Sequence, residues 1–500
     1  MSDNLFSAFA HSAASRLEKP ALLWSRQQFS YGKFFDQSLW VAEHLSRQLG
    51  VHPGDRVAIW MRNRPEFVPT LFGIFAAGAA AVPVNNFLKP TEVAYMLADA
   101  GVRVLITDDA APDAVAALQA LRPELKVIRA DEIPADPPAS SFEPVPRRRS
   151  DLAVLIYTSG TTGKPKGAML THGNLLHNVE SCRQILQIAD IDRMVLMLPM
   201  FHSFMLTVCI LLPLLVGGSI VLIQSLTPPK AMLEELLGNS GTVLPAMAQI
   251  FRALAGLPAG VELPLRLCIS GAGPLPHEIL RAFNARHPKV PLIEGYGLSE
   301  ASPVVSLNPV QGPWIPGTIG PPIPDVEVSV QDDTGRFLPD GEDGEICVRG
   351  GNVMAGYWNA PEKTAETIVN GWLRTGDIGH RRPDGYFVIT DRKKDMLKPN
   401  GINVYPREIE EVIYQFPGVR ECAVVGEPDE RRGERPVAFV ALDEGTVFDE
   451  KALLAFLKER LADFKLPRRA ILLPTLPRNA TGKILKTSLR DLLVARSEAA

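Results

Sequence analysis

Hydroxyl groups, glycines and lysines are concentrated in residues 158–167, directly after the apolar run Leu152 to Tyr157. Gly160 and Gly163 leave the backbone free to turn its N–H groups inward, and the neighbouring hydroxyls and lysines add donors and positive charge. A bound polyphosphate requires such a concentration of donors. The residues that we expect to contact phosphate are Thr158, Ser159, Gly160, Thr161, Thr162 and Lys166.

The Walker A phosphate loop is the nearest familiar motif, but its spacing differs from that of this segment. Walker A has four residues between its glycines and a Ser or Thr after its lysine. Here Gly160 and Gly163 enclose two residues and Pro165 follows Lys164, so the spacing does not fit a Walker-type enzyme. A flexible polar linker is the structural alternative, and the interleaved lysines and glycines behind a strand argue against it.

The elements that must position this loop alternate between strand-like and helical patterns. Strand-like runs at residues 56–61, 81–84 and 102–107 alternate with helical patterns at residues 65–77 and 90–98. Such alternation is typical of an α/β fold with the helices packed on a sheet. We therefore predict an α/β architecture for this part of the chain.

Two later regions have different patterns. Short strands at residues 326–330, 345–349 and 386–390, separated by Gly, Asp and Pro turns, predict a β-rich subdomain. The pattern then changes to a compact α+β arrangement. Because five hundred residues exceed what one hydrophobic core normally organises, we predict a large N-terminal domain, residues 1–393, and a small C-terminal domain, residues 394–500.

The composition disfavours several kinds of partner and compartment. The 52 basic and 56 acidic residues give a net charge of −4 without a basic stripe, so nucleic acid is not expected as the main partner. The five cysteines are scattered and form no CxxC pair, which favours a reduced compartment. Residues 1–20 carry charges and lack a long apolar core, so no export signal is expected and the predicted localisation is cytoplasmic.

One apolar segment has the length of a membrane helix. Phe204 to Ile223 spans twenty residues without a charge. Pro213 and the pair Gly217-Gly218 divide it into a helix and a β-branched strand, and no nearby Lys or Arg anchors it. We therefore expect this segment to be buried and predict no transmembrane segment, whereas peripheral contact with a membrane remains compatible with the sequence.

The segment 158–167 resembles the phosphate loop of the acyl-adenylate-forming superfamily, which comprises acyl-CoA synthetases, luciferases and adenylation domains of peptide synthetases. Further motifs of this family occur in the expected order as far as Lys483, so the resemblance covers nearly the whole chain. It is closest to the medium- and long-chain fatty acyl-CoA synthetases. The resemblance implies a large domain of α/β subdomains plus a β-rich subdomain, followed by a small, mobile α+β domain.

Residues 295–300, with the sequence Gly-Tyr-Gly-Leu-Ser-Glu, resemble the nucleotide motif of this family. The resemblance implies that Tyr296 lies against adenine beside Gly297, that Ser299 contacts phosphate and that Glu300 holds Mg²⁺. The family more often has Thr at the position of Ser299, a change that retains the hydroxyl. A hard cation prefers oxygen ligands, so one carboxylate together with phosphate oxygens and waters suffices.

Three later motifs complete the implied catalytic set. Residues 371–377 resemble the motif whose carboxylate accepts both ribose hydroxyls, which makes Asp377 the ribose anchor. Arg392 matches the ribose and phosphate contact of the family, and Lys394 matches the hinge about which the C-terminal domain rotates. Lys483 matches the catalytic lysine that reaches the carboxylate and the α-phosphate, where a long ammonium donor can neutralise two approaching anions.

The family reaction has two halves, and it implies ATP, Mg²⁺ and coenzyme A as cofactors. A carboxylate attacks the α-phosphate of ATP to give acyl-AMP and pyrophosphate, and the CoA thiol then displaces AMP. Gly401 would border the pantetheine tunnel, where the absence of a side chain lets a thin chain pass. Asn400 departs from the family pattern, because many relatives have a second glycine there.

The carboxylic acid substrate is predicted from the residues expected around the acyl group. His202 stands where amino-acid-activating relatives carry an Asp, so an α-amino acid is disfavoured. In relatives this position is an aromatic that lines the acyl pocket, although a histidine in an apolar run is usually a hydrogen-bonded core residue. Met200 nearby and the loop Gly271, Ala272 and Gly273 indicate an apolar acyl site. We predict a medium- or long-chain fatty acid.

Two alternatives from the sequence differ in the step after nucleotide binding. The chain could be a ligase that loads a separate carrier protein instead of CoA. It could also be a nucleotide-binding regulator without turnover, although intact Glu300, Asp377, Arg392 and Lys483 argue against that. Nothing specific supports luciferase-like oxygenation, and the motifs do not determine acyl chain length, pathway or oligomeric state.

Overall fold

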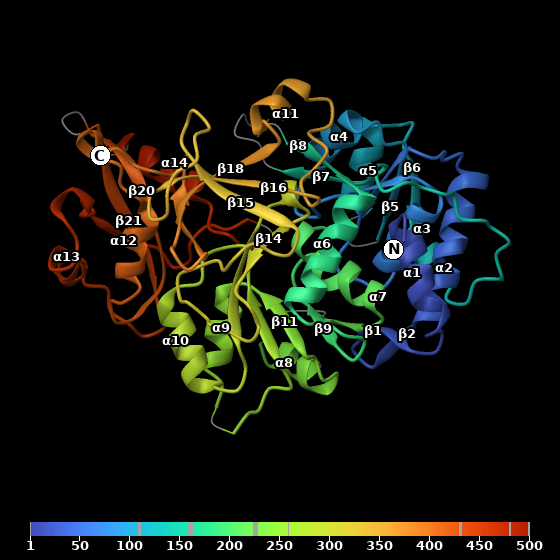
Figure 1. Ribbon diagram of the computed structural model, residues 1–500, viewed down its shortest axis with the longest axis horizontal. Helices are drawn as coiled ribbons and strands as arrows, with labels where there is room; N and C mark the ends of the chain where they lie inside the picture. Colours follow the sequence, from blue (N-terminus) through green and yellow to red (C-terminus); the bar gives the residue numbers. More distant parts are fainter. Residues whose placement is uncertain are drawn as a thin grey trace.

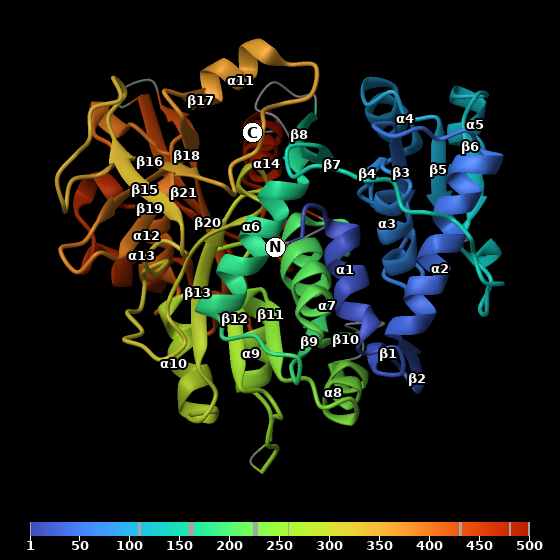
Figure 2. The ribbon, with the colours of Figure 1, turned by 45° about the vertical axis from the view of Figure 1, so that its right-hand side comes forward.

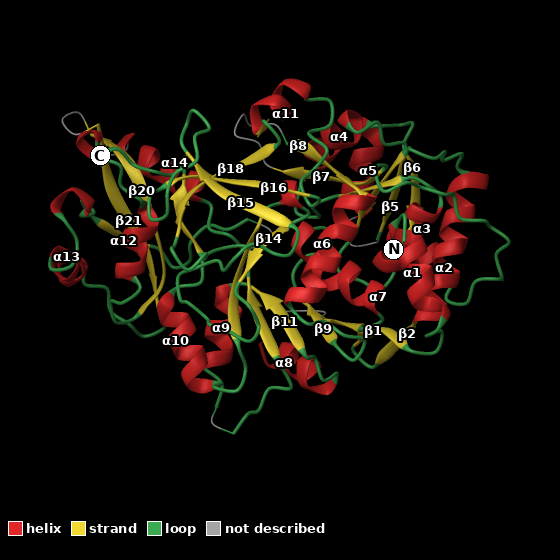
Figure 3. Ribbon diagram, in the orientation of Figure 1, coloured by secondary structure: helices red, strands yellow, loops and turns green. Residues whose placement is uncertain are grey.

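The computed structural model describes residues 2–108, 112–158, 165–223, 229–258, 260–429, 433–479 and 482–498. Over these residues the strands form four sheets, with helices packed around and between them (Figures 1 and 3). Figure 1 shows the N-terminal part of the chain, in blue, at one end of the long axis and the C-terminal part, in red, at the other. The fold matches the predicted order of α/β, β-rich and α+β regions.

The first sheet carries the strand that leads into the phosphate loop. Its six strands have the order β6-β5-β3-β4-β7-β8, in which β8 alone is antiparallel to its neighbour. Its elements and their connections are α2 (Tyr31–Glu43), η1 (His44–Gln48), β3 (Arg56–Trp60), α3 (Phe67–Ala76), β4 (Ala80–Pro83), α4 (Pro90–Asp99), β5 (Val104–Thr107), α5 (Pro112–Leu121), β6 (Lys126–Arg129), η2 (Ala130–Glu132), β7 (Leu152–Thr158) and β8 (Lys166–Thr171). The predicted strands at residues 56–61, 81–84 and 102–107 are confirmed.

The second sheet carries the nucleotide motif at the end of β13. Its eight strands have the order β14-β13-β12-β11-β9-β10-β1-β2 and are parallel from β1 to β13 along this path. Its elements and connections are α1 (Leu5–Ala14), β1 (Pro20–Trp24), β2 (Gln27–Ser30), α6 (His172–Ile185), β9 (Arg193–Leu196), η3 (Met205–Leu211), α7 (Leu212–Val216), β10 (Ser219–Leu222), α8 (Pro229–Gly238), β11 (Val243–Ala246), α9 (Ala248–Ala255), β12 (Leu267–Ser270), α10 (His277–Arg286), β13 (Leu292–Gly297), η4 (Ser299–Ala301) and β14 (Val304–Leu307).

The third sheet and the C-terminal sheet come next in the chain. The third sheet has the order β15-β16-β18-β17, with β19 also paired to β18, and it lies between the other parts in Figure 1. The C-terminal sheet has the order β20-β21-β22. Their elements are β15 (Val326–Gln331), β16 (Gly344–Gly350), α11 (Pro361–Thr367), β17 (Ile368–Val369), β18 (Trp372–Arg381), β19 (Phe387–Arg392), η5 (Pro399–Gly401), α12 (Pro406–Ile413), β20 (Val419–Asp429), β21 (Gly433–Leu442), α13 (Glu450–Lys458), η6 (Asp463–Lys465), β22 (Ala470–Leu472) and α14 (Lys486–Glu498).

The main hydrophobic core joins the two α/β sheets. Figure 2 shows α1, α6 and α7 between the sheet of β9 to β12 and the sheet of β3 to β6. Buried residues of these helices and of both sheets belong to one apolar cluster. Phe9 of α1 and Phe72 of α3 stack within it, with ring centroids 4.1 Å apart. Large aromatic side chains dominate such cores because each one buries a large apolar area.

The C-terminal part has apolar clusters of its own. They consist of residues from Leu397 onward, with Leu453 and Leu457 of α13 packed against β20 and β21 in one of them. These leucines lie four residues apart on one face of the helix, as the sequence pattern predicts. A separate core allows this part to move as a unit.

The apolar segment Phe204 to Ile223 is buried, as predicted. It forms η3, α7 and β10, and its helical portion ends at Gly217, which adopts a left-handed φ of 97°. Pro213 does not end the helix, because it lies in the first turn of α7, where a missing N–H is tolerated. Within the described residues, no helix combines the length and apolar character that crossing a membrane requires.

Candidate active site

The carboxylate predicted to hold a metal lies beside the strand that leads into the phosphate loop. Glu300, in η4, accepts hydrogen bonds through Oε1 from the Thr158 hydroxyl at 3.3 Å and from the Tyr357 hydroxyl at 2.9 Å. Its Oε2 accepts none from the described residues. Tertiary structure therefore brings together the end of β7 and the turn after β13, which are far apart in the sequence.

The donor set around Glu300 fits a hard cation that is shared with a ligand. Among the described residues, no cluster of three or more His, Cys, Asp or Glu side chains could hold a metal alone. Glu300 is half-buried, and one of its oxygens has no hydrogen bond from the part of the chain that the structure describes. Phosphate oxygens and waters would complete the shell that Mg²⁺ prefers.

Lys166 begins β8 and lies on the other side of Tyr357. Its ammonium is 5.8 Å from the centre of the Tyr357 ring, a cation–π distance. Burial lowers the pKa of Lys166, and the nearby Lys363 adds to this effect. The predicted phosphate contacts Ser159, Gly160, Thr161 and Thr162 lie outside the described residues.

The rest of the nucleotide motif is tied to the segment that contains His202. Ser299 lies 3.0 Å from the hydroxyl of the buried Ser203, oxygen to oxygen. A side chain at Gly297 would place its Cβ 2.2 Å from the carbonyl oxygen of Pro303, so only glycine fits there. The motif residues are therefore held by close backbone packing as well as by hydrogen bonds.

Asp377 is the most tightly held carboxylate of the predicted site. The Tyr296 hydroxyl donates to its Oδ2 at 2.5 Å, and Nε of Arg392 lies 3.0 Å from its Oδ1. Asp377 and Arg392 face each other across β18 and β19 in the sheet register. Burial raises the pKa of Tyr296 well above its ordinary value, and the charge of Asp377 adds to this. The predicted ribose-binding residue Asp377 therefore lies together with Tyr296 and Arg392, two other residues of the predicted site.

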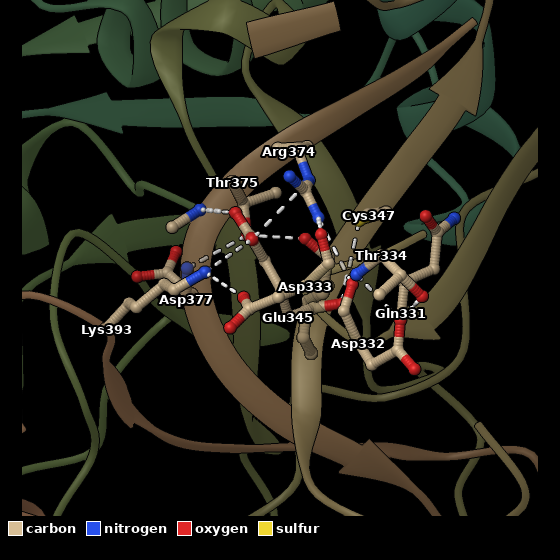
Figure 4. A network of polar contacts seen from close by, with 12 residues as sticks. Gln331, Asp332, Asp333, Thr334, Glu345, Cys347, Arg374, Thr375, Asp377 and Lys393 are labelled. Carbon is tan, nitrogen blue, oxygen red and sulfur yellow. Dashed lines mark hydrogen bonds and ion pairs between the residues drawn. The ribbon is translucent and has the colours of Figure 1, made fainter. Parts of the chain in front are cut away.

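A second buried carboxylate fixes the backbone that precedes Asp377. Glu345 of β16 accepts a hydrogen bond from the N–H of Gly376 at 3.0 Å and contacts Nζ of Lys393 at 3.3 Å. Lys393 also donates to Asp333 at 2.6 Å. Figure 4 shows this network, in which Asp333, Glu345, Asp377 and Lys393 lie close together.

Lys483 reaches the same region from the C-terminal part of the chain. Its backbone N–H donates to Oδ1 of Asn479 at 2.9 Å, which fixes the turn that presents the side chain. Burial by surrounding groups lowers the pKa of Lys483 to about 8, and the charge of Arg392 adds to this while Asp377 opposes it. The residue is nonetheless exposed to solvent. Three of the predicted site residues, Asp377, Arg392 and Lys483, therefore lie near enough for their charges to affect one another.

Contacts between the two parts hold Lys483 in this place. Arg252 of α9 forms a two-pronged contact with Asp443, at 2.9 and 2.8 Å, and also donates to the carbonyl oxygens of Val419 and Arg420. These partners belong to β20 and to the segment after β21. Arg252 therefore joins the large α/β part to the C-terminal sheet.

A buried acid provides another contact between the parts. Glu294 of β13 lies 3.7 Å from a guanidinium nitrogen of Arg407 in α12. Burial raises the pKa of Glu294 to about 7, although the charge of Arg407 opposes this shift. Arg407 also donates to the carbonyl of Ile389 at 3.0 Å. The start of α12 is thereby attached to β13 and β19.

His202 lies among apolar groups and is neutral at physiological pH. Burial lowers its pKa to about 4. Its Nδ1 accepts a hydrogen bond from the N–H of Phe204 at 3.3 Å, so the neutral ring carries its proton on Nε2. A Cβ built on Gly271 would lie 2.9 Å from the Phe204 ring, which packs directly on that backbone. The adjacent Ala272 has a φ of 65°, and a Cβ on Gly273 would meet nothing within 4 Å.

The predicted hinge and CoA residues lie at the junction of the two parts. Lys394 is exposed, between Lys393, which contacts β16, and Asp395, which pairs with Arg490 of α14 at 2.7 Å. Gly401 has a φ of 78°, and a Cβ there would meet nothing within 4 Å. The role of Gly401 stays a prediction in this arrangement.

Sequence reasoning missed several residues that shape the site. Tyr357 contacts Glu300, and Glu345 accepts a hydrogen bond from the backbone just before Asp377. Arg252 with Asp443 joins the two parts. None of them has a distinctive spacing from a recognised motif. Their roles arise from three-dimensional contacts between segments that are distant in sequence.

Two family models match the chain. One, described as AMP-binding enzyme, matches residues 9–358, and the other, described as AMP-binding enzyme C-terminal domain, matches residues 408–483. The first span contains Glu300 and the second ends at Lys483, whereas Asp377 lies between the two.

Individual proteins match over nearly their full length. A feruloyl-CoA synthase from Amycolatopsis sp is 38% identical over 452 residues, covering 89% of this chain and 90% of the relative. A long-chain-fatty-acid–CoA ligase from Bacillus subtilis (strain 168) is 34% identical over 536 residues, covering 97% and 94%. The crystal structure of ATP-bound MatB from Rhodopseudomonas palustris superimposes with a TM-score of 0.89 at 33% identity, covering 98% and 99%.

Proposed function

The chain belongs to the AMP-binding enzyme family and is an AMP-forming acid–CoA ligase, and from this premise we propose that its substrate is a carboxylic acid with an apolar body. The observation that carries the proposed residue roles is the contact of Asp377 with Tyr296 and Arg392, with Lys483 near enough for the charges of Arg392 and Asp377 to affect its pKa. That arrangement suits the first half-reaction, in which a carboxylate attacks the α-phosphate of ATP.

We assign the nucleotide-binding roles to residues of this site. Residues at the end of β7 and Lys166 bind the β- and γ-phosphates, and Asp377 accepts the ribose hydroxyls. Glu300 would hold Mg²⁺, which offsets the charge of the triphosphate when bound. The hydrogen bond from Tyr296 and the ion pair with Arg392 keep Asp377 oriented before ATP arrives.

Lys483 acts in the first half-reaction by bringing two anions together. A carboxylate oxygen of the acid forms a bond to the α-phosphorus, and the bond from that phosphorus to the bridging oxygen breaks, releasing pyrophosphate. The ammonium of Lys483 donates to the incoming carboxylate and to an α-phosphate oxygen as charge accumulates there. In the second half-reaction the CoA sulfur attacks the acyl carbon, its proton is lost, and AMP leaves.

The domain boundary supports a rotation between the two halves. Lys393 is fixed to the third sheet through Asp333 and Glu345, whereas Asp395 is fixed to α14 through Arg490. Lys394 lies between these attachments and is exposed. We therefore propose that residues 394–500 turn about Lys394 after adenylation, and that Gly401 then borders the path of the CoA arm.

A medium- or long-chain fatty acid is the first candidate substrate, and an arylpropenoic acid such as ferulic acid is the second. The neutral His202 and the Phe204 ring against Gly271 suit an acyl group without charge near its carboxyl end. The 34% identical fatty-acid ligase supports the first candidate, and the 38% identical feruloyl-CoA synthase supports the second.

Pyrophosphate release from ATP and Mg²⁺ across a panel of acids tests this proposal. The panel contains octanoate, palmitate, ferulate, benzoate and several amino acids, each with and without CoA, and products are identified by mass spectrometry. Release that depends on octanoate or palmitate and gives acyl-CoA only with CoA supports the fatty acid. Preference for ferulate selects the second candidate, and acyl-AMP without thioester would instead indicate transfer to a carrier protein.

A further inference from the structure

A tyrosine outside the predicted motifs lies between two charged groups at the phosphate end of the site. The Tyr357 hydroxyl donates to Oε1 of Glu300 at 2.9 Å, and the Tyr357 ring faces the ammonium of Lys166 at 5.8 Å from its centre. One neutral side chain thus contacts an anion through its hydroxyl and a cation through its π face.

The backbone around Tyr357 is attached to both motifs that the side chain contacts. The N–H of Met354 donates to the carbonyl of Glu300 at 2.9 Å, and the N–H of Trp358 donates to the carbonyl of Gly167 at 2.7 Å. Residues 354–358 therefore bridge η4 and the edge strand β8. Because both ends are bonded, Tyr357 has little freedom to leave its place.

The backbone N–H of Tyr357 is itself bonded. It donates to the hydroxyl of Thr364 in α11 at 2.8 Å, and that hydroxyl donates in turn to the carbonyl of Ala360 at 3.0 Å. Gly356 precedes Tyr357 with a φ of 134°, and a Cβ there would lie 2.7 Å from the Thr364 methyl group. The tight turn at Gly356 and the Thr364 contact together fix where the tyrosine ring lies.

Lys166 and Glu300 influence each other without forming an ion pair among the described residues. Burial is the main cause that lowers the pKa of Lys166, and the charge of Glu300 opposes it. In a partly desolvated cleft, an ammonium and a carboxylate attract strongly enough to pair when nothing separates them. Once paired, they would compete with the triphosphate and its cation for the same two charges.

We propose that Tyr357 is a positioning residue that orients Glu300 for Mg²⁺ and keeps Glu300 apart from Lys166. Its hydrogen bond, with that of Thr158, occupies Oε1 and leaves Oε2 for the cation. Its ring separates the carboxylate from the ammonium, so each charge stays available to Mg²⁺·ATP. This inference rests on the proposed function, in which Glu300 holds the metal and Lys166 binds phosphate.

Two substitutions separate the roles of the hydroxyl and of the ring. Tyr357→Phe keeps the ring between Lys166 and Glu300 but removes the hydrogen bond, whereas Tyr357→Ala removes both. Tyr386→Phe is a matched control, since it removes a tyrosine hydroxyl that donates to the carbonyl of Pro313 at 2.9 Å, away from these residues. Circular dichroism of each variant establishes that it is folded.

The measurement is the affinity for ATP by titration calorimetry, with Mn²⁺ as the probe cation and, separately, with EDTA present. Electron paramagnetic resonance monitors the bound Mn²⁺ directly. We expect Tyr357→Phe to weaken Mn²⁺·ATP binding about tenfold, the scale of one hydrogen bond to a charged group. Metal-free ATP binding should be unchanged in that variant and weakened in Tyr357→Ala, where Lys166 is free to pair with Glu300.

Other outcomes have distinct meanings. Equal loss with and without Mn²⁺ in Tyr357→Phe would overturn the proposal, because it would indicate a general distortion of the nucleotide site. Unchanged Mn²⁺·ATP affinity in that variant would also overturn it. Wild-type protein that binds ATP no more tightly with Mn²⁺ than with EDTA would overturn the metal role of Glu300 as well, which distinguishes failure of the proposed function from failure of this inference alone.

Discussion

The two parts of the proposed site hold their reactive groups in different ways. On the large-domain side, Asp377 is fixed by a 2.5 Å hydrogen bond from Tyr296 and a 3.0 Å contact with Arg392. On the C-terminal side, the Lys483 ammonium forms no hydrogen bond or ion pair with any described side chain. Its position depends on its own loop and on contacts between the two parts, such as Arg252 with Asp443.

This difference matches what each group has to do. A carboxylate that binds ribose in both half-reactions gains from being oriented before the ligand arrives, because no reorganisation then opposes binding. In the proposed function Lys483 acts in the first half-reaction alone and leaves with its domain, and short side-chain bonds would oppose that departure. The contact of Arg252 with Asp443 is partly exposed, and exposed ion pairs are individually weak.

Removing the mobile group should have the largest effect. We expect Lys483→Ala to lower the rate of acid-dependent pyrophosphate release by about 10² to 10³, the scale of removing one charge-stabilising donor from a transition state. Conversion of supplied acyl-AMP to acyl-CoA should be almost unchanged. Lys451→Ala, at the exposed start of α13, is the control. Equal loss in both half-reactions would contradict the restricted role of Lys483.

Changing the fixed group should weaken nucleotide binding instead. Asp377→Asn retains shape but removes the charge that pairs with Arg392 and accepts hydrogen bonds. We expect AMP affinity, measured by calorimetry, to fall about tenfold to a hundredfold, as for hydrogen bonds to charged groups. Asp384→Asn is the control, because Asp384 is an exposed carboxylate that contacts Arg382 in the turn between β18 and β19. Unchanged AMP affinity would remove Asp377 from the ribose site.

The pH dependence of the adenylation rate should follow the protonation of Lys483. The pKa of Lys483 is lowered to about 8 by burial and by the charge of Arg392, and the protonated form is the one that donates. Above pH 8 the group loses its proton, so kcat/KM for pyrophosphate release should fall by about tenfold per pH unit. Lys483→Arg keeps its charge and should lack this decline. If kcat/KM of Lys483→Arg declines with the same midpoint pH, the titrating group is not Lys483.

Weakening the contact between the two parts should have the smallest effect. Arg252→Ala and Asp443→Asn remove the same partly exposed ion pair, so each should slow adenylation by only about two- to fivefold. The double variant should match Arg252→Ala, because that change already removes the contact with Asp443 as well as the hydrogen bonds to the carbonyls of Val419 and Arg420. Arg281→Ala, which removes an exposed pair with Glu278 inside α10, is the control. Additive losses would show that Arg252 and Asp443 act separately.

Much of the site could be predicted because its motifs are short and local. The strand before Thr158 was predicted from its apolar run, whereas Gly297, Glu300 and Asp377 were assigned because their motifs resemble those of a known family, and their roles stay predictions. Gly297 illustrates this point. Close backbone packing leaves no space for a side chain at position 297, so a glycine is required there. The contact residues Tyr357 and Glu345 could not be found this way, because their partners lie on other strands.

The sequence by itself determined the order of α/β, β-rich and α+β regions, because hydrophobic periodicity and turn residues act over short distances along the chain. It also determined which charged and hydroxyl groups are available for nucleotide chemistry. Only the tertiary structure decided that Tyr296 bonds to Asp377, that Tyr357 stands between Lys166 and Glu300, and that Lys483 lies within electrostatic reach of Arg392. The physical reason is that these contacts join segments on different sheets and domains, where the packing of whole elements, and not local pattern, sets the distances.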